Sequence, residues 1–173
     1  MASPSTSNEP FSLLGIAPSY EIDLSALEKA FFERSKELHP DRYANAPAAE
    51  RVVALSKARA LNDAYQILRK PVPRAEYLLS RAGVKIGDNE RLDPTFLMEI
   101  LELREALAEA RHAGKLADVE RMQGEMAARR NATLALLPAL FTANDLAGIK
   151  TQLIVLRYLD RYLEECDAAL GED

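Results

Sequence analysis

The sequence contains very few of the residues that hold metals and disulfides. Its 173 residues include one cysteine, two histidines and no tryptophan. One cysteine excludes an internal disulfide, a CxxC metal clamp and an iron–sulfur cluster bound by thiolates of this chain alone. We therefore expect no metal site and no bound cofactor.

Long apolar runs and strongly basic regions are also missing. No stretch of about 18 apolar residues occurs, which predicts no transmembrane helix and no membrane partner. Residues 10–80 hold 10 Lys/Arg and 9 Asp/Glu (+1), whereas residues 94–173 hold 9 and 14 (−5). Neither part has the basic footprint of a nucleic-acid-binding protein, so we expect no nucleic-acid partner.

Helical periodicity runs along the chain, and no segment alternates apolar and polar residues for long enough to predict a strand. With only 7 glycines, the composition favours an all-α fold. Asp23 and Asp93 are expected to cap helices, and Pro94 suits a first helical position. Helices are predicted over 11–16, 24–38, 47–69 and 74–81, and then over 94–112, 115–137 and 144–170. Near one stripe of the 47–69 helix lie Val52, Leu55, Ala58, Asn62, Tyr65 and Leu68.

Composition shifts divide the chain into four parts. Residues 1–9 are polar and read as a disordered lead-in. Residues 10–82 form an N-terminal helical unit, and residues 83–93, with Gly87, Asp88 and Asn89, form a linker. Residues 94–171 are predicted to form a three-helix antiparallel bundle.

A rigid tripeptide, His39-Pro40-Asp41, lies between two amphipathic helices. Pro40 fixes the backbone, so the side chains of His39 and Asp41 project from a defined turn. Asp41 can accept two hydrogen bonds from an arginine of a partner, and His39 can donate or accept one. The plainer alternative is a helix cap at Asp41 or Asn45 beside a surface histidine.

The helix over 96–109 has more apolar residues than one buried stripe requires. Phe96, Ile100, Leu103 and Leu107 share one side at about 100° per residue. Leu97, Met98 and Leu101 lie on another side, interleaved with Glu102, Glu105 and Glu109. An apolar cluster rimmed by carboxylates is typical of a protein-binding surface. In the alternative interpretation, Leu97 and Leu101 only widen the core stripe.

Several motifs in order resemble one family over roughly residues 10 to 170. They are FSLLGIAPSY, HPDRYANAPAAE, ARALNDAYQILRKPVPRAEYLLSRAG and FLMEILELREAL. They resemble HscB, the J-domain co-chaperone of iron–sulfur cluster assembly, called Jac in fungal mitochondria. The resemblance implies an L-shaped all-α adaptor without a catalytic site. Its J-domain, a helical hairpin, would stimulate the ATPase of a 70-kDa heat-shock-type chaperone (HscA-like), and its bundle would hold the iron–sulfur scaffold protein (IscU-like).

The resemblance also implies roles for individual residues. The chaperone would contact His39, Pro40, Asp41, Lys36 and Arg42. The scaffold would contact Leu97, Met98, Leu101, Glu102, Glu105, Glu109 and Tyr158, although Tyr158 could equally be a partly buried structural tyrosine. Arg74 and Tyr77 match the family pattern and are expected to be structural, as is Cys166.

One departure from the family lies in the helix before the tripeptide. J-domains usually present a basic helix there, but Lys29, Arg34 and Lys36 are matched here by Glu28, Glu33 and Glu37. Which basic residues touch the chaperone is therefore left open. A cysteine-rich N-terminal module, found in eukaryotic members, does not occur in this sequence, which favours a bacterial cytoplasmic protein.

Two other functions stay open at this point. A J-domain protein could serve a different client, which binding of the scaffold would distinguish. An enzyme could use His39 and Asp41 as an acid–base pair, but it would lack a nucleophile in context, a phosphate loop and metal ligands.

Overall fold

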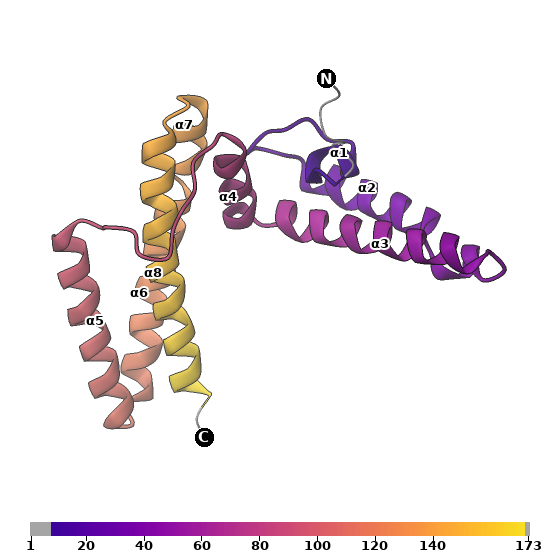
Figure 1. Ribbon diagram of the computed structural model, residues 1–173. Helices are drawn as coiled ribbons and strands as arrows, with labels where there is room; N and C mark the ends of the chain where they lie inside the picture. The colour runs from indigo at the N-terminus through magenta and orange to yellow at the C-terminus, as the bar shows by residue number, and fades with distance from the viewer. Residues whose placement is uncertain (1–7, 172–173) are drawn as a thin grey trace. The chain divides into compact units, whose positions relative to one another are not determined.

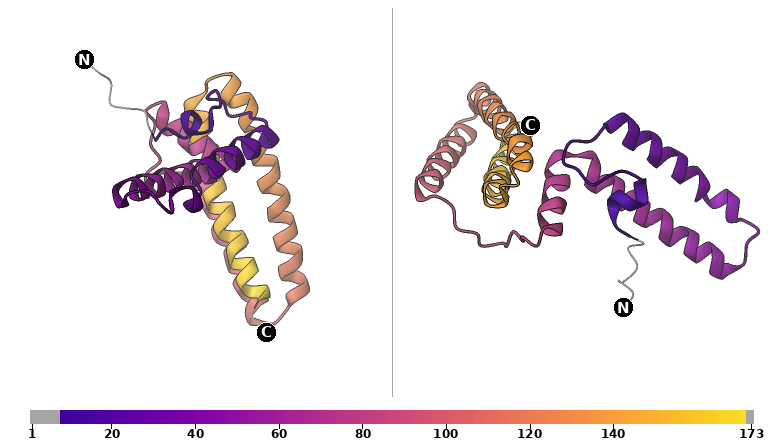
Figure 2. Two further views of the ribbon diagram at one scale, coloured as in Figure 1. Left: turned by 90° about the vertical axis from the view of Figure 1, so that its right-hand side faces the viewer. Right: turned by 90° about the horizontal axis from the view of Figure 1, so that it is seen from above.

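The computed structural model describes residues 8–171, and every regular element in that range is a helix (Figures 1 and 2). The chain divides into two compact units, Met1–Arg81 and Ala82–Asp173. The elements are α1 (Pro10–Leu14), α2 (Leu24–Glu37), the 3-10 helix η1 (Pro40–Tyr43), α3 (Ala48–Arg69), α4 (Pro71–Arg81), α5 (Pro94–His112), α6 (Leu116–Leu134), α7 (Leu137–Thr142) and α8 (Leu146–Leu170). The predicted all-α fold is thus confirmed.

In the first unit, α2 and α3 lie side by side as an antiparallel hairpin with η1 at its tip (Figure 1). Helix α1 packs mainly on α3 and also on α2, and α4 packs on α3. The core between them contains Phe11, Leu14, Leu27, Leu61, Ala64 and Leu68. Burial of these side chains favours the association of α1, α2 and α3, because an isolated helix is at most marginally stable in water.

Local signals fix where these helices begin and end. The Asp23 carboxylate accepts hydrogen bonds from the backbone N–H groups of Ser25 (2.9 Å) and Ala26 (3.2 Å), so the predicted cap of α2 is confirmed. Helix α1 ends at Gly15, whose φ of 64° lies in the left-handed region that glycine adopts without strain. Helix α4 begins at Pro71 rather than at residue 74, because a proline in the first turn loses no helical hydrogen bond.

The prediction that residue 9 belongs to a disordered lead-in is wrong. Residues 1–7 lie outside the described residues. Glu9, however, caps α1, and its carboxylate accepts a hydrogen bond from the Ser12 N–H at 2.8 Å. The same carboxylate accepts a hydrogen bond from the Tyr77 hydroxyl on α4. Glu9 therefore belongs to the folded unit.

The stripe predicted for α3 is wrong near the tip of the hairpin. Val52 and Leu55 are 66% and 53% exposed, and Asn62 is also exposed. Leu68 is buried as predicted, and the other buried residues of α3 are Ala54, Leu61 and Ala64. Alanine at two of these positions lets α2 and α3 approach closely, and the larger aliphatic residues at the tip then face outward.

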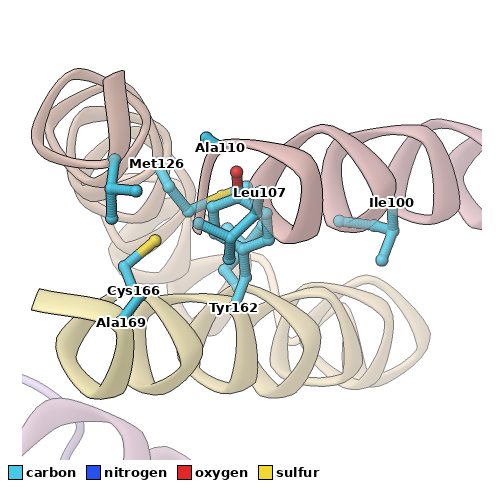
Figure 3. Packing of buried hydrophobic residues seen from close by; sticks show 9 residues of the cluster. Ile100, Leu107, Ala110, Met126, Tyr162, Cys166 and Ala169 are labelled. Atoms are coloured by element: carbon cyan, nitrogen blue, oxygen red, sulfur yellow. The ribbon is translucent and has the colours of Figure 1, made fainter. Parts of the chain in front are cut away.

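In the second unit, α6 and α8 form an antiparallel pair, and α5 lies along both of them (Figure 1). Their core includes Ile100 and Leu107 from α5, Val119 and Met126 from α6, and Leu159, Tyr162 and Cys166 from α8 (Figure 3). The helix expected over 115–137 ends early, and a short helix that was not predicted follows it. Helix α6 ends at Leu134 and the short α7 follows, because Pro138 has no N–H to continue a helix but fits the first turn of a new one.

Polar contacts hold residues 87–90 against α8. The Glu90 carboxylate accepts a hydrogen bond from the Gly87 N–H (2.9 Å) and pairs with the Lys150 ammonium at 3.0 Å. Arg157 donates a hydrogen bond to the Gly87 carbonyl at 3.3 Å. The segment that precedes α5 is therefore anchored within the second unit.

Candidate functional site

The tripeptide forms an exposed and locally hydrogen-bonded turn. His39 is the N-cap of η1, and its Nδ1 accepts a hydrogen bond from the Asp41 backbone N–H at 3.2 Å. The same Nδ1 lies 3.5 Å from an oxygen of the Asp41 carboxylate, so backbone and side chain of Asp41 both approach this edge of the ring. The side chains of His39 and Asp41 are 59% and 92% exposed. Both groups can therefore be reached by a partner protein.

Backbone contacts tie this turn to the end of α2. The His39 N–H donates to the Lys36 carbonyl (3.4 Å), and the Arg42 N–H donates to the His39 carbonyl (3.0 Å). The Tyr43 hydroxyl donates to the Glu37 carbonyl at 3.5 Å, which partners one of the carbonyls left open at the end of α2. The structure thus exposes Lys36, His39, Pro40, Asp41 and Arg42, while Leu38 between them packs against the core.

A buried arginine supports the end of the hairpin that lies opposite the turn. Arg74 on α4 is 8% exposed; its Nε donates to the Tyr20 carbonyl (2.6 Å) and its Nη1 donates to the Leu68 carbonyl (2.8 Å). Its guanidinium also lies over the Tyr20 ring, 5.0 Å from the centroid. One side chain therefore joins α4, the end of α3 and the segment before α2.

Helix α5 separates into two faces as the periodicity predicts. Ile100 and Leu107 are each 3% exposed and point into the core, whereas Met98 and Leu101 are 59% and 55% exposed. Leu97 is half-buried, and the carboxylates of Glu102, Glu105 and Glu109 are on exposed positions. Leu101 therefore does not widen the core stripe, and an apolar cluster rimmed by three carboxylates lies on the outer face of α5.

Tyr158, on α8, packs against the core side of α5. Its ring packs edge-to-face on Phe96 with the centroids 6.0 Å apart, and Arg161 lies over it at 5.9 Å. The Arg129 guanidinium lies over the Phe96 ring and donates hydrogen bonds to both carboxylate oxygens of Glu99, at 2.6 and 3.0 Å. These contacts fix the start of α5 and hence the direction of its outer face. They agree with a structural part for Tyr158, and its contact with a partner stays a prediction.

Sequence reasoning overlooked Phe32 on α2. Its side chain is 57% exposed, although the adjacent Phe31 is partly buried and stacks on Tyr65 with the centroids 4.2 Å apart. The sequence signal for its exposure is its position on the helix, because Phe32 is 100° around α2 from Phe31, which faces the core.

Cys166, the single thiol of the chain, is buried in the second unit. Burial raises the pKa of the Cys166 thiol to about 11, which disfavours the reactive thiolate, and its side chain points from α8 into the core (Figure 3). No three His, Cys, Asp or Glu side chains among those residues gather as a metal site would require. No described helix has the length and apolarity needed to cross a membrane.

Comparisons with known proteins agree with this two-part arrangement. Residues 9–77 match the DnaJ domain, and residues 92–167 match the HSCB C-terminal oligomerisation domain. The chain is 37% identical to the co-chaperone protein HscB homolog of Azoarcus sp. (strain BH72), with 92% of each chain covered. It is 36% identical to that of Bordetella petrii, with 94% of this chain and 96% of the relative covered.

Solved structures give the same result. Chaperone HscB from Vibrio cholerae superposes with a TM-score of 0.81 and 33% identity, covering 92% of this chain and 95% of that one. The human co-chaperone protein HscB superposes with a TM-score of 0.86 and 25% identity, covering 97% and 85%. Together with the exposed turn at His39 and the helical second unit, these matches show that the chain belongs to the HscB family of J-domain co-chaperones, which work with a 70-kDa heat-shock-type chaperone.

Proposed function

We propose that this protein is a non-enzymatic adaptor between an HscA-like chaperone and an IscU-like iron–sulfur scaffold protein. Its turn stimulates ATP hydrolysis by the chaperone, and the outer face of α5 delivers the scaffold, which aids cluster assembly and transfer in the bacterial cytoplasm. The observation that carries the proposal is the pairing of an exposed His39-Pro40-Asp41 turn in one unit with an exposed apolar helix face in the other.

The turn supports the first half of the proposal because it combines rigidity with exposure. Pro40 and the short 3-10 helix fix the backbone, so little conformational entropy is lost when a partner binds. Asp41 can then accept paired hydrogen bonds from an arginine of the chaperone, while the exposed ring of His39 can donate or accept one. Lys36 and Arg42 lie on either side as electrostatic contacts.

The outer face of α5 supports the second half. Met98 and Leu101 expose apolar surface that a solvated helix face does not require, and methionine adapts to the shape of a partner. The rim of Glu102, Glu105 and Glu109 fits a basic patch on the scaffold. Leu97 extends the apolar cluster, with Tyr158 as an additional expected contact.

The first test is ATPase stimulation of a purified HscA-like chaperone. The variant His39→Gln is expected to lose stimulation while its circular dichroism spectrum is unchanged. The matched control is His112→Gln, which alters the other histidine of the chain at an exposed position on α5 and should stimulate normally. Full stimulation by His39→Gln would contradict the proposal.

The second test is scaffold binding measured by calorimetry. Replacing Leu97 and Leu101 together by alanine is expected to weaken binding at least about tenfold, since both would lose buried apolar contact. The double variant Leu116→Ala/Leu136→Ala, at positions 41% and 50% exposed outside α5, is the control and should bind normally. Equal affinity of both double variants would return the two α5 leucines to a structural part.

A J-domain protein with another client is the alternative. It predicts that the unaltered chain stimulates the chaperone but does not bind the IscU-like scaffold. Scaffold binding together with greater ATPase stimulation in the scaffold's presence would exclude that alternative. Turnover of a substrate by the chain alone would contradict the adaptor assignment.

A further inference from the structure

Phe32 is an exposed aromatic residue on a helix that would need none there for folding. Its side chain is 57% exposed, and the ring of Phe31 lies edge-to-face against it with the centroids 6.4 Å apart. Phe31 is itself held by stacking on Tyr65. The Phe32 ring is therefore presented from a supported position, which lowers the entropy lost when a partner covers it.

Phe32 lies on a stripe that runs into the turn. Phe32, Lys36 and His39 have the spacing i, i+4, i+7, and the His39 N–H still bonds the Lys36 carbonyl at 3.4 Å. Lys29, three residues earlier, falls on the same side. Glu28, four residues before Phe32 and exposed, is also only about 40° from it around the helix, whereas Glu33 and Glu37 are about 100° and 140° away. The exposed ring is thus flanked by Lys29, Lys36 and the carboxylate of Glu28, and Lys36 connects this face to His39 just beyond the end of α2.

The charge on α2 cannot supply strong attraction over a distance. Three basic and three acidic residues, namely Lys29, Arg34, Lys36, Glu28, Glu33 and Glu37, cancel along the helix. Arg34 is also partly buried, and its guanidinium packs where a side chain at Gly15 would lie. A partner that binds this face must therefore gain affinity from close contact.

We propose that Phe32 is an apolar anchor for the chaperone, inserted into an apolar depression bordered by carboxylates that pair with Lys29 and Lys36. This inference rests on the proposed function, because its occupant is the chaperone that the His39 turn engages. Continuity of the stripe with that turn selects this occupant over a second copy of the chain. Burial of one aromatic ring at the centre of a contact is the usual source of a binding hot spot.

The test measures the concentration of co-chaperone that gives half-maximal ATPase stimulation of an HscA-like chaperone, without scaffold. Phe32→Ala is expected to raise that concentration about tenfold while the maximal stimulation is retained, because the turn is intact. Phe32→Leu should restore most of the affinity. The matched control is Leu24→Ala, on the same helix and 53% exposed but about 80° off the stripe, which should leave the value unchanged.

The outcomes separate this inference from the proposed function. Absence of stimulation by the unaltered chain would overturn both. A half-maximal concentration for Phe32→Ala equal to that of the unaltered chain, with His39→Gln still inactive, would overturn only the anchor. Equal losses in Phe32→Ala and Leu24→Ala, or a Phe32-dependent self-association with an unchanged half-maximal concentration, would also overturn it. Thermal unfolding of each variant shows that the fold is retained.

Discussion

At the scale of single residues, Arg74 illustrates how a charge is buried with its partners. Its guanidinium supplies donors to two carbonyls and lies over one aromatic ring, and the Tyr20 and Leu68 carbonyls depend on it. A carbonyl that loses its donor inside a protein costs more than the hydrogen bond contributed. The planar fork also explains why a lysine would not be equivalent.

Arg74→Met is therefore expected to destabilise the unit Met1–Arg81 by about 3 kcal/mol. Arg74→Lys should cost less, because one ammonium can still donate to one of the two carbonyls. Native-state hydrogen exchange of amides in α3 and α4 measures the change in opening free energy. Unchanged protection in Arg74→Met would show that the two carbonyls find other donors.

Tyr77 makes the stability of the same unit dependent on pH. Burial, followed by the hydrogen bond to Glu9, raises the pKa of Tyr77 to about 12 from an ordinary value of 10.0. A raised pKa stabilises the fold while the group is neutral, and that contribution is lost as the pH rises from about 10 to about 12. In Tyr77→Phe the hydrogen bond is lost at every pH, but this alkaline loss is absent.

The free energies of unfolding of the unaltered chain and Tyr77→Phe are thus expected to differ by about 1 kcal/mol at pH 7 and to converge above pH 10. Urea denaturation at several pH values measures both curves. The raised pKa of Tyr162 affects the two proteins equally and cancels in the difference. A constant difference across that range would contradict the assignment.

At the scale of the element, α5 carries its core contacts and its exposed apolar residues on one helix. Leu107→Ala is expected to lower the free energy of unfolding by about 2 to 4 kcal/mol, because it leaves a cavity at a position 3% exposed. Leu101→Ala, at 55% exposure, should change it by less than about 0.5 kcal/mol. Urea denaturation measures both, and similar losses would mean that Leu101 is buried in solution.

The helices differ in how far the sequence could predict them. The cap at Asp23 and the Asp93-Pro94 start of α5 depend on neighbouring residues, so local patterns found them. The exposed face of α3 at Val52 and Leu55 could not be found that way, since it depends on how closely α2 and α3 approach. Pro138 was a visible break, but the apolar residues around it hid the short α7.

The candidate site residues also differ in how far the sequence could predict them. His39, Pro40 and Asp41 are adjacent in the chain, so the sequence was sufficient to single them out, and the structure adds their exposure and hydrogen bonds. Tyr158 comes from a different helix, and only the tertiary contact with Phe96 shows that its ring joins the core side of α5. Exposure at Phe32 likewise required the packed hairpin.

At the scale of the whole molecule, the charge is unevenly divided along the chain. Residues 10–80 have a net charge of +1 and residues 94–173 have −5. If the acidic part holds a scaffold through carboxylates and the near-neutral part holds a chaperone through close contact, the two partners should respond differently to ionic strength. Screening weakens exposed charge pairs far more than buried apolar contact.

We therefore expect that raising the salt concentration from about 50 to about 300 mM weakens scaffold binding about fivefold. The concentration for half-maximal chaperone stimulation without scaffold should change less than about twofold over the same range. Replacing Glu102, Glu105 and Glu109 together by glutamine should remove most of the salt dependence of scaffold binding while leaving chaperone stimulation intact, since all three side chains lie on the outer face of α5. Equal salt sensitivity of the two partners, or a triple variant with unchanged salt dependence, would show that the carboxylate rim does not face the scaffold.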